Sequence, residues 1–233
     1  MNNHFIFVMS ICFALASYAA AGYLFKRLIR YSQLSVAESI LTGSGLIALI
    51  TYFVSMVKPD YLFLVSIGLM VLSLVGALLL LLQRVIKNKY QNGVNNDKSV
   101  YLILLLMIVP LLLGTLNCPF WGDELNGHAP MVRYWLEKKN FFIDPSVHYT
   151  TYAWPKLWAI MIYHTLCLGG TLHEAAGRWL SIVMILIGAL FVWQEFTRSF
   201  GFNKWISLVW ASFWLPLVFI PMFAWSASWY YSM

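Results

Sequence analysis

Asp123 and Glu124 are adjacent carboxylates that follow an apolar run, a proline and two aromatic residues. At a membrane interface the lower dielectric raises the pKa of a carboxylate, which makes it a better proton acceptor near neutral pH. His128 lies four residues after Glu124, so both side chains can point to one side of a helix. We therefore take Asp123 and Glu124 as candidate catalytic residues, with Glu124 and His128 as candidate ligands of a divalent cation. A Glu/His pair at this spacing is more often engaged in surface hydrogen bonding than in metal binding, and an acidic pair is also favoured at any helix start.

Three basic residues downstream of the acidic pair could neutralise a phosphate: Arg133, Lys156 and Arg178. Lys156 follows Trp154-Pro155 at the start of a short apolar stretch, where it would sit near lipid phosphates or anchor the chain at the interface. Arg178 precedes an apolar run, and its guanidinium can bind a phosphate with two hydrogen bonds or serve as an ordinary interfacial arginine. We take all three, with His128, as candidate substrate-binding residues.

The segment after Glu124 has the apolar periodicity of an amphipathic helix. Met131, Val132 and Trp135 can share one face with the neighbouring leucines, and Arg133 and Glu137 lie elsewhere. The three cysteines, Cys12, Cys118 and Cys167, are too few and too scattered for a disulfide framework or a zinc site. One bridge between Cys118 and Cys167 remains open as an alternative, because both would lie on one side of the membrane.

The composition excludes a water-soluble class of protein. Of the 233 residues, 61% are hydrophobic and 10% are Asp, Glu, Lys or Arg, whereas charged residues make up about a quarter of soluble domains. Mean hydropathy is +0.73. A net charge of +6 could suggest nucleic-acid binding, but most of the basic residues lie in short loops between apolar runs, so we expect no nucleic-acid partner.

The elements that must position the candidate residues are membrane spans of roughly 20 residues each. Six apolar runs meet this requirement: 5–25, 40–57, 61–82, 100–116, 179–196 and 205–222. The run 157–168 is too short to span and predicts an interfacial or re-entrant helix. The sequence therefore predicts an all-α, multi-pass transmembrane bundle of about six spans, with one large loop that contains short interfacial helices.

The distribution of Lys and Arg predicts how the bundle is oriented. One side carries nine of them: Lys26, Arg27, Arg30, Arg84, Lys87, Lys89, Lys98, Arg198 and Lys204. Because short cytoplasmic loops are enriched in these residues, this side is predicted to be cytoplasmic and the amino terminus to lie outside. The 117–177 loop, which carries every candidate site residue except Arg178 at its edge, is then extracytoplasmic. We divide the chain into three amino-terminal spans, 1–99, and a second part, 100–233, that starts with the fourth span.

In this order, the motifs of the second part resemble those of the glycosyltransferase C superfamily, in particular protein O-mannosyltransferases and the bacterial transferases that move aminoarabinose onto lipid A. The matching stretches are Trp121-Gly122-Asp123-Glu124, Met131 to Lys139, Trp154-Pro155-Lys156-Leu157, Glu174-Ala175-Ala176-Gly177-Arg178 and Arg198-Ser199-Phe200-Gly201. The resemblance covers about Val100 to Met222. Lys156 takes the place of the second proline of the family's Pro-Pro motif, and family members continue for several further spans, so we expect an amino-terminal fragment.

This resemblance implies transfer of a sugar from a polyprenyl-phosphate donor to an acceptor hydroxyl on a glycan, lipid or protein. It implies that Asp123 contacts the acceptor and acts as the base, and that Arg178 and neighbouring basic residues lie near the donor phosphate. Cation dependence varies across the superfamily, so the resemblance leaves a metal open. An extracytoplasmic reaction of this kind fits a bacterial inner membrane.

Two other classes of protein are the alternatives. A non-enzymatic membrane protein, such as a transporter part or an assembly subunit, would bury charged groups within its spans to line a path. An O-antigen polymerase or ligase would place its main loop later in the chain and would favour arginines over an early Asp-Glu pair. The near absence of charge inside the six runs and the early acidic pair favour the transferase.

Overall fold

The computed structural model describes residues 3–29, 35–87, 128–143, 156–173 and 175–211. Within these residues it contains helices and no strand, which confirms the all-α class. The helices are α1 (Asn3–Leu28), α2 (Val36–Val57), the 3₁₀ helix η1 (Pro59–Tyr61), α3 (Leu62–Lys87), α5 (Ala129–Lys138), α6 (Lys156–Leu166) and α7 (Ala176–Ser199). A further helical segment covers 204–211.

Four of these helices, α1, α2, α3 and α7, are long and apolar enough to cross a membrane. They coincide with the predicted runs 5–25, 40–57, 61–82 and 179–196, and they fit an integral membrane protein. The predicted run 100–116 lies outside the described residues. Of the run 205–222, residues 205–211 are helical and the rest lies outside as well.

Helix α2 is longer than its apolar run, because a polar cap extends its start. Ser35 precedes α2 and its Oγ accepts a hydrogen bond from the Glu38 backbone N–H, at 3.3 Å. This cap lets α2 begin four residues before the apolar run at Ile40. The helix ends at Val57 because Pro59, two residues later, cannot continue its hydrogen bonding and opens η1 instead.

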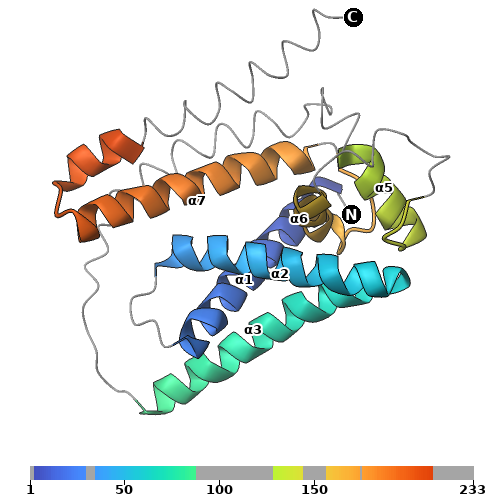
Figure 1. Cartoon of the computed structure of the whole chain (residues 1–233), viewed down its shortest axis with the longest axis horizontal. Helices are drawn as coiled ribbons and strands as arrows, with labels where there is room; N and C mark the ends of the chain where they lie inside the picture. Colours follow the sequence, from blue (N-terminus) through green and yellow to red (C-terminus); the bar gives the residue numbers. More distant parts are fainter. Residues whose placement is uncertain (1–2, 30–34, 88–127, 144–155, 174, 212–233) are drawn as a thin grey trace, which may run out of the picture.

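The backbones of α1 and α2 touch where the two helices cross (Figure 1). A Cβ added to Gly43 would lie 1.8 Å from the Tyr18 carbonyl oxygen, and one added to Gly22 would lie 1.9 Å from the Ser39 carbonyl oxygen. Small residues at a crossing are the usual way for membrane helices to pack closely. The main hydrophobic core adjoins this contact and includes Tyr18 and Ile47.

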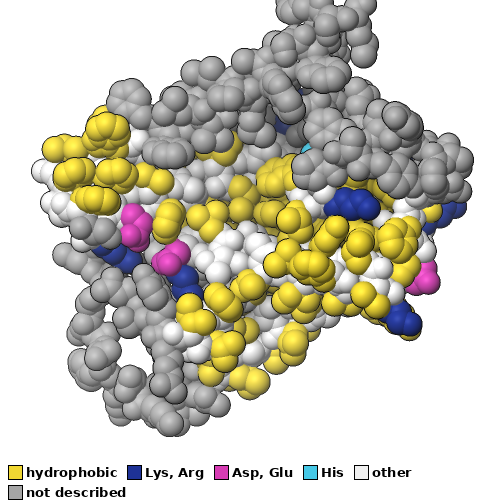
Figure 2. All heavy atoms as spheres, viewed as in Figure 1, with side chains coloured by type: hydrophobic (Ala, Val, Ile, Leu, Met, Phe, Trp, Pro, Cys, Tyr) yellow, Lys and Arg dark blue, Asp and Glu magenta, His cyan; other side chains and the backbone are white. Residues whose placement is uncertain are grey.

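Polar contacts mark one end of the bundle, where α1, α2 and α7 meet. Lys26 of α1 pairs with Glu38 of α2, and the Ser35 hydroxyl donates to Gln194 Oε1 of α7. In the described part of the face shown in Figure 2, apolar side chains predominate, and charged side chains gather toward its two ends. This distribution is expected of a bundle whose middle faces lipid.

The opposite end of the bundle holds the start of α1, the α2–α3 turn and the start of α7. His4 of α1 hydrogen-bonds His173, which lies just before α7, at 3.0 Å. The starts of α1 and α7 thus lie at this end, whereas Lys26 of α1 and Gln194 of α7 lie at the other end. Helices α1 and α7 therefore run in the same direction, and α2 runs antiparallel to both. This is the alternation that the predicted spans require.

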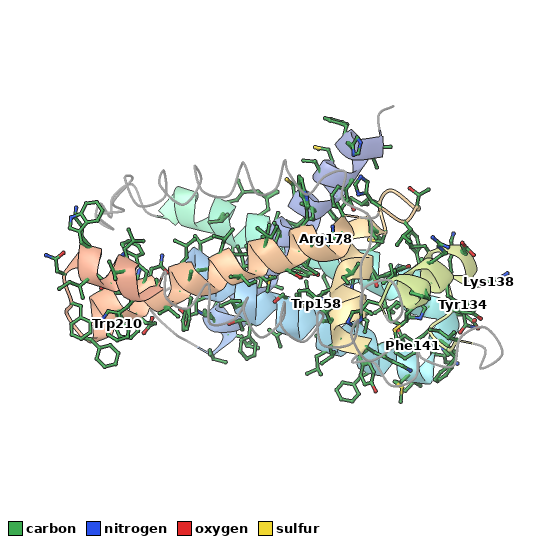
Figure 3. All side chains as sticks on the ribbon, turned by 90° about the horizontal axis from the view of Figure 1, so that it is seen from above. Tyr134, Lys138, Phe141, Trp158, Arg178 and Trp210 are labelled. Atoms are coloured by element: carbon green, nitrogen blue, oxygen red, sulfur yellow. The ribbon has the colours of Figure 1, made fainter. Side chains whose placement is uncertain are left out.

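Helix α6 lies across the direction of α7, as the two views in Figures 1 and 3 show. It packs against α1, α2, α5 and α7, and every residue from Ala159 to Leu166 is buried. The predicted short helix is thus present. Its burial on several sides explains why it is apolar without an amphipathic stripe.

Candidate functional site

Three elements gather at the end of the bundle where α7 begins: α5, α6 and the first turn of α7. Figure 3 shows Arg178 at the start of α7, with Tyr134, Lys138 and Phe141 further out on α5 and its following loop, and Trp210 at the far end. The described candidate residues, His128, Arg133, Lys156 and Arg178, all lie on these elements. Lys156 begins α6, whereas Arg178 follows the chain that leaves the opposite end of this helix.

Asp123 and Glu124 lie outside the described residues, so their assignment as catalytic carboxylates remains a prediction. The pairing of Glu124 with His128 is likewise untested. Within the parts of the chain that the structure describes, no cluster of three or more His, Cys, Asp or Glu side chains could hold a metal.

His128 immediately precedes α5 and its side chain is buried, with 9% of its surface exposed. Burial lowers the pKa of this imidazole to about 4, because the charged form loses its hydration. The ring is therefore neutral at pH 7. A neutral imidazole can hydrogen-bond a carboxylic acid or coordinate a metal ion. These are the two interactions that the spacing between Glu124 and His128 suggests.

Arg133 is exposed on the outer face of α5, whereas Met131, Val132 and Trp135 are buried. The predicted faces of this amphipathic helix are confirmed. Arg133 is thus directed away from the core against which α5 packs, which makes it a weaker candidate for contact with a substrate than Lys156 or Arg178.

The loop after α5 is fixed to the turn between α2 and α3. Trp135 Nε1 donates to the Phe141 carbonyl at 3.0 Å, and the Phe141 N–H donates to the Pro59 carbonyl at 3.0 Å. Asn140 Nδ2 donates to Asp60 Oδ1 at 2.6 Å. No local pattern in the sequence predicts these contacts. The sequence predicts only that the polar residues Asp60 and Asn140 lie at the same end of the bundle.

Lys156 opens α6, and its Nζ lies 4.9 Å from the centre of the Phe141 ring. A cation over an aromatic face is stabilised electrostatically. Burial lowers the pKa of this lysine. Because an anion beside a lysine favours its charged form, a phosphate at this position would raise that pKa again and would bind favourably.

Arg178 is half-buried in the first turn of α7, close to buried Trp179 and Leu180. Helix α6 contacts both α5 and α7, so it connects the segment of Lys156 with the segment of Arg178. Arg178 therefore remains a candidate for donor binding, together with Lys156.

The sequence does not predict the buried polar network that surrounds His164. His164 Nδ1 lies 3.0 Å from the Tyr18 hydroxyl of α1, and Nε2 lies 3.4 Å from Thr51 Oγ1 of α2. The available signal was a histidine inside the apolar run 157–168. Cys167 is a free, buried thiol that donates to the His164 carbonyl at 3.2 Å. Cys118, its possible bridge partner, lies outside the described residues.

Acid is expected to destabilise the fold through His164. Burial lowers the pKa of this imidazole to about 3, whereas an exposed imidazole takes up a proton near pH 6.5. As the pH falls below about 6.5, the unfolded state binds this proton first, so the free energy of unfolding decreases toward pH 3. Thermal unfolding of the detergent-solubilised chain should show a melting temperature that is lower at pH 5 than at pH 7.

The matched variant for this measurement is His164→Gln, which has no imidazole to titrate. Its melting temperature should fall less between pH 7 and pH 5 than that of the wild type. Some fall should remain, because burial also lowers the pKa of His128. An equal fall in both proteins would contradict the role of His164.

Searches of protein-family models, curated proteins and solved structures found no match for this chain, so the site stands on its own residues and geometry.

Proposed function

We propose that the chain acts in a membrane glycosyltransferase, which transfers a sugar from a polyprenyl-phosphate donor to an acceptor hydroxyl at the extracytoplasmic face. The observation that carries this proposal is the gathering of α5, α6 and the start of α7 at one end of an apolar bundle. These elements include Lys156, Arg178 and the helix that follows the Asp123-Glu124 pair. Positive charge and a carboxylate at one membrane face are the two requirements of this transfer.

In the proposed reaction a carboxylate of Asp123 accepts the proton of the acceptor hydroxyl. The hydroxyl oxygen then forms a bond to the anomeric carbon of the sugar, while the bond between that carbon and the phosphate oxygen breaks. The electron pair of the broken bond leaves with the polyprenyl phosphate. Lys156 and Arg178 stabilise the negative charge that develops on this leaving group. Glu124 and His128 support Asp123 or hold a cation.

The charge distribution of the described spans favours this reading over a transporter part. Their charged residues all lie near a helix end: Lys26, Arg27, Glu38, Asp60, Arg178, Glu195 and Arg198. A transport path would need charged groups deeper within the spans. The proposed location is an inner membrane of a bacterium, with the 117–177 loop outside, and it is supported by the excess of Lys and Arg on the opposite side.

Arg178→Gln tests the donor-binding side of the proposal. We expect the initial rate of transfer, measured against the concentration of undecaprenyl phosphate linked to glucose, mannose or aminoarabinose, to fall by about 10- to 100-fold, because a charged hydrogen bond to phosphate is lost. Arg198→Gln is the matched control, since Arg198 lies at the other end of α7. Equal rates for the two variants would place the donor phosphate elsewhere.

A further inference from the structure

A pocket of about 150 Å³ lies between the first turns of α1 and the segment that ends α6 and leads toward α7. Its polar wall comes from Ser10, Thr165, Thr171 and His173, and its apolar wall comes from Phe7 and aliphatic side chains. Among the described residues that line it, none is Asp, Glu, Lys or Arg. The pocket therefore suits a neutral ligand, because a charged group would find no opposite charge there.

Ser10 offers this pocket a hydroxyl group that is not otherwise used. Ser10 is fully buried, and its Oγ has no hydrogen-bond partner among the described residues. Ser17, two turns further along α1, is equally buried but donates to the Phe13 carbonyl at 2.8 Å. Because a buried hydroxyl without a partner is unfavourable, a ligand that supplies one gains affinity.

His173 forms a fixed wall of the pocket. Its ring stacks on Phe7 with centroids 4.1 Å apart, and its Nδ1 accepts a hydrogen bond from the Ala175 N–H at 3.2 Å. A neutral imidazole carries one N–H, so Nε2 holds the proton and donates it to His4 Nδ1, 3.0 Å away. Both nitrogens of His173 are thus engaged, which disfavours a metal between the two histidines.

We propose that this pocket binds one neutral pyranose ring, as the acceptor sugar of the transfer proposed above. An engineered apolar cavity of this volume takes one benzene ring. Because this pocket is open on one side, a pyranose ring can enter it while some of its exocyclic hydroxyls stay outside. The apolar wall can cover the C–H faces of such a ring, while the hydroxyls of Ser10 and Thr171 pair with ring hydroxyls. The role as acceptor rests on the proposed function, whereas the binding of the ring does not.

Binding is tested with the full chain in phosphatidylcholine nanodiscs, which contain no glycolipid. Saturation-transfer NMR is recorded with the methyl glycosides of glucose, mannose and galactose, and with cyclohexanol and inorganic phosphate as comparison ligands. We expect a signal from at least one glycoside and none from phosphate. Equal binding of cyclohexanol, or no binding of any glycoside, would overturn the proposal. Competition by an added galactosyl lipid would show that the ring is presented by a lipid.

Two pairs of variants locate the binding in this pocket. Gly169→Leu directs a side chain toward Ile6, whose Cγ2 lies 3.2 Å from the position of the added Cβ, and Gly45→Leu is its control because nothing lies within 4 Å of that position. Ser10→Ala is compared with Ser17→Ala. We expect the glycoside Kd to rise at least tenfold in Gly169→Leu and about fivefold in Ser10→Ala, and to stay unchanged in both controls.

The outcomes separate this pocket from the proposed reaction. Glycoside binding that Gly169→Leu abolishes, in a chain that transfers no sugar, would support the pocket and refute the transferase. Transfer with an acceptor KM that is the same in Gly169→Leu, Ser10→Ala and wild type would support the transferase and refute the pocket as acceptor site. The Ser10→Ala variant keeps the test decisive if Gly169→Leu does not fold.

Discussion

Asp123→Asn is expected to reduce the rate of sugar transfer by about 10²- to 10⁴-fold, which is the usual contribution of a general base. The amide has nearly the same shape as the carboxylate but does not accept the proton of the acceptor hydroxyl. The donor KM should change little, because Lys156 and Arg178 are proposed to bind the donor phosphate. The measurement is the initial rate at saturating donor for the full chain in proteoliposomes.

Glu137→Gln is the matched control for this substitution. Glu137 is an exposed acid on α5, the helix that follows the acidic pair. Its replacement removes one carboxylate close to the acidic pair in the sequence and should leave transfer unchanged. A rate for Asp123→Asn within a factor of two of wild type would remove Asp123 as the base, whereas an equal loss in both variants would indicate a general effect of surface charge.

Gly43→Ala is expected to destabilise the bundle strongly. The new Cβ would lie 1.8 Å from a backbone oxygen of Tyr18, and backbone atoms at a helix crossing can yield only if the helices separate. Overpacking of this kind costs about 1–3 kcal/mol or more. Thermal unfolding of the solubilised chain should therefore give a clearly lower melting temperature.

Gly45→Ala, two residues further along the same helix, should have the opposite effect. Nothing lies within 4 Å of a Cβ at this position, and alanine is favoured over glycine in a helix interior by about 1 kcal/mol. Gly22→Ala, on the other side of the crossing, should behave like Gly43→Ala. Melting temperatures that are equal for Gly43→Ala and Gly45→Ala would show that α1 and α2 do not pack as described.

The helices that fit a membrane could be predicted because their signal is local. A run of apolar residues with the length of a bilayer identifies a span without any knowledge of its neighbours. The ends of the helices were less predictable, since they depend on caps such as Ser35 that lie outside the apolar run. The same length criterion separated the short α6 from the spans.

The contacts within the candidate site could not be predicted in the same way. His164 and Tyr18 are 146 residues apart, and nothing in either sequence neighbourhood indicates the other. The position of Lys156 over Phe141 depends on how the α5 loop attaches to the turn at Pro59. Topology alone predicted that Lys156 and Arg178 share one end of the bundle, but it says nothing about their contacts.

The transverse helix α6 imposes an order on the biogenesis of this protein. Its His164 finds Tyr18 and Thr51 on α1 and α2, which leave the ribosome more than a hundred residues earlier. Until α6 arrives, those two hydroxyls lack the imidazole, and the hairpin of α1 and α2 is held by its close glycine contact and by the Lys26–Glu38 pair. The α1–α2 hairpin can therefore insert into the membrane before the bundle is fully packed. The packing is completed when α6 forms its contacts with α1 and α2.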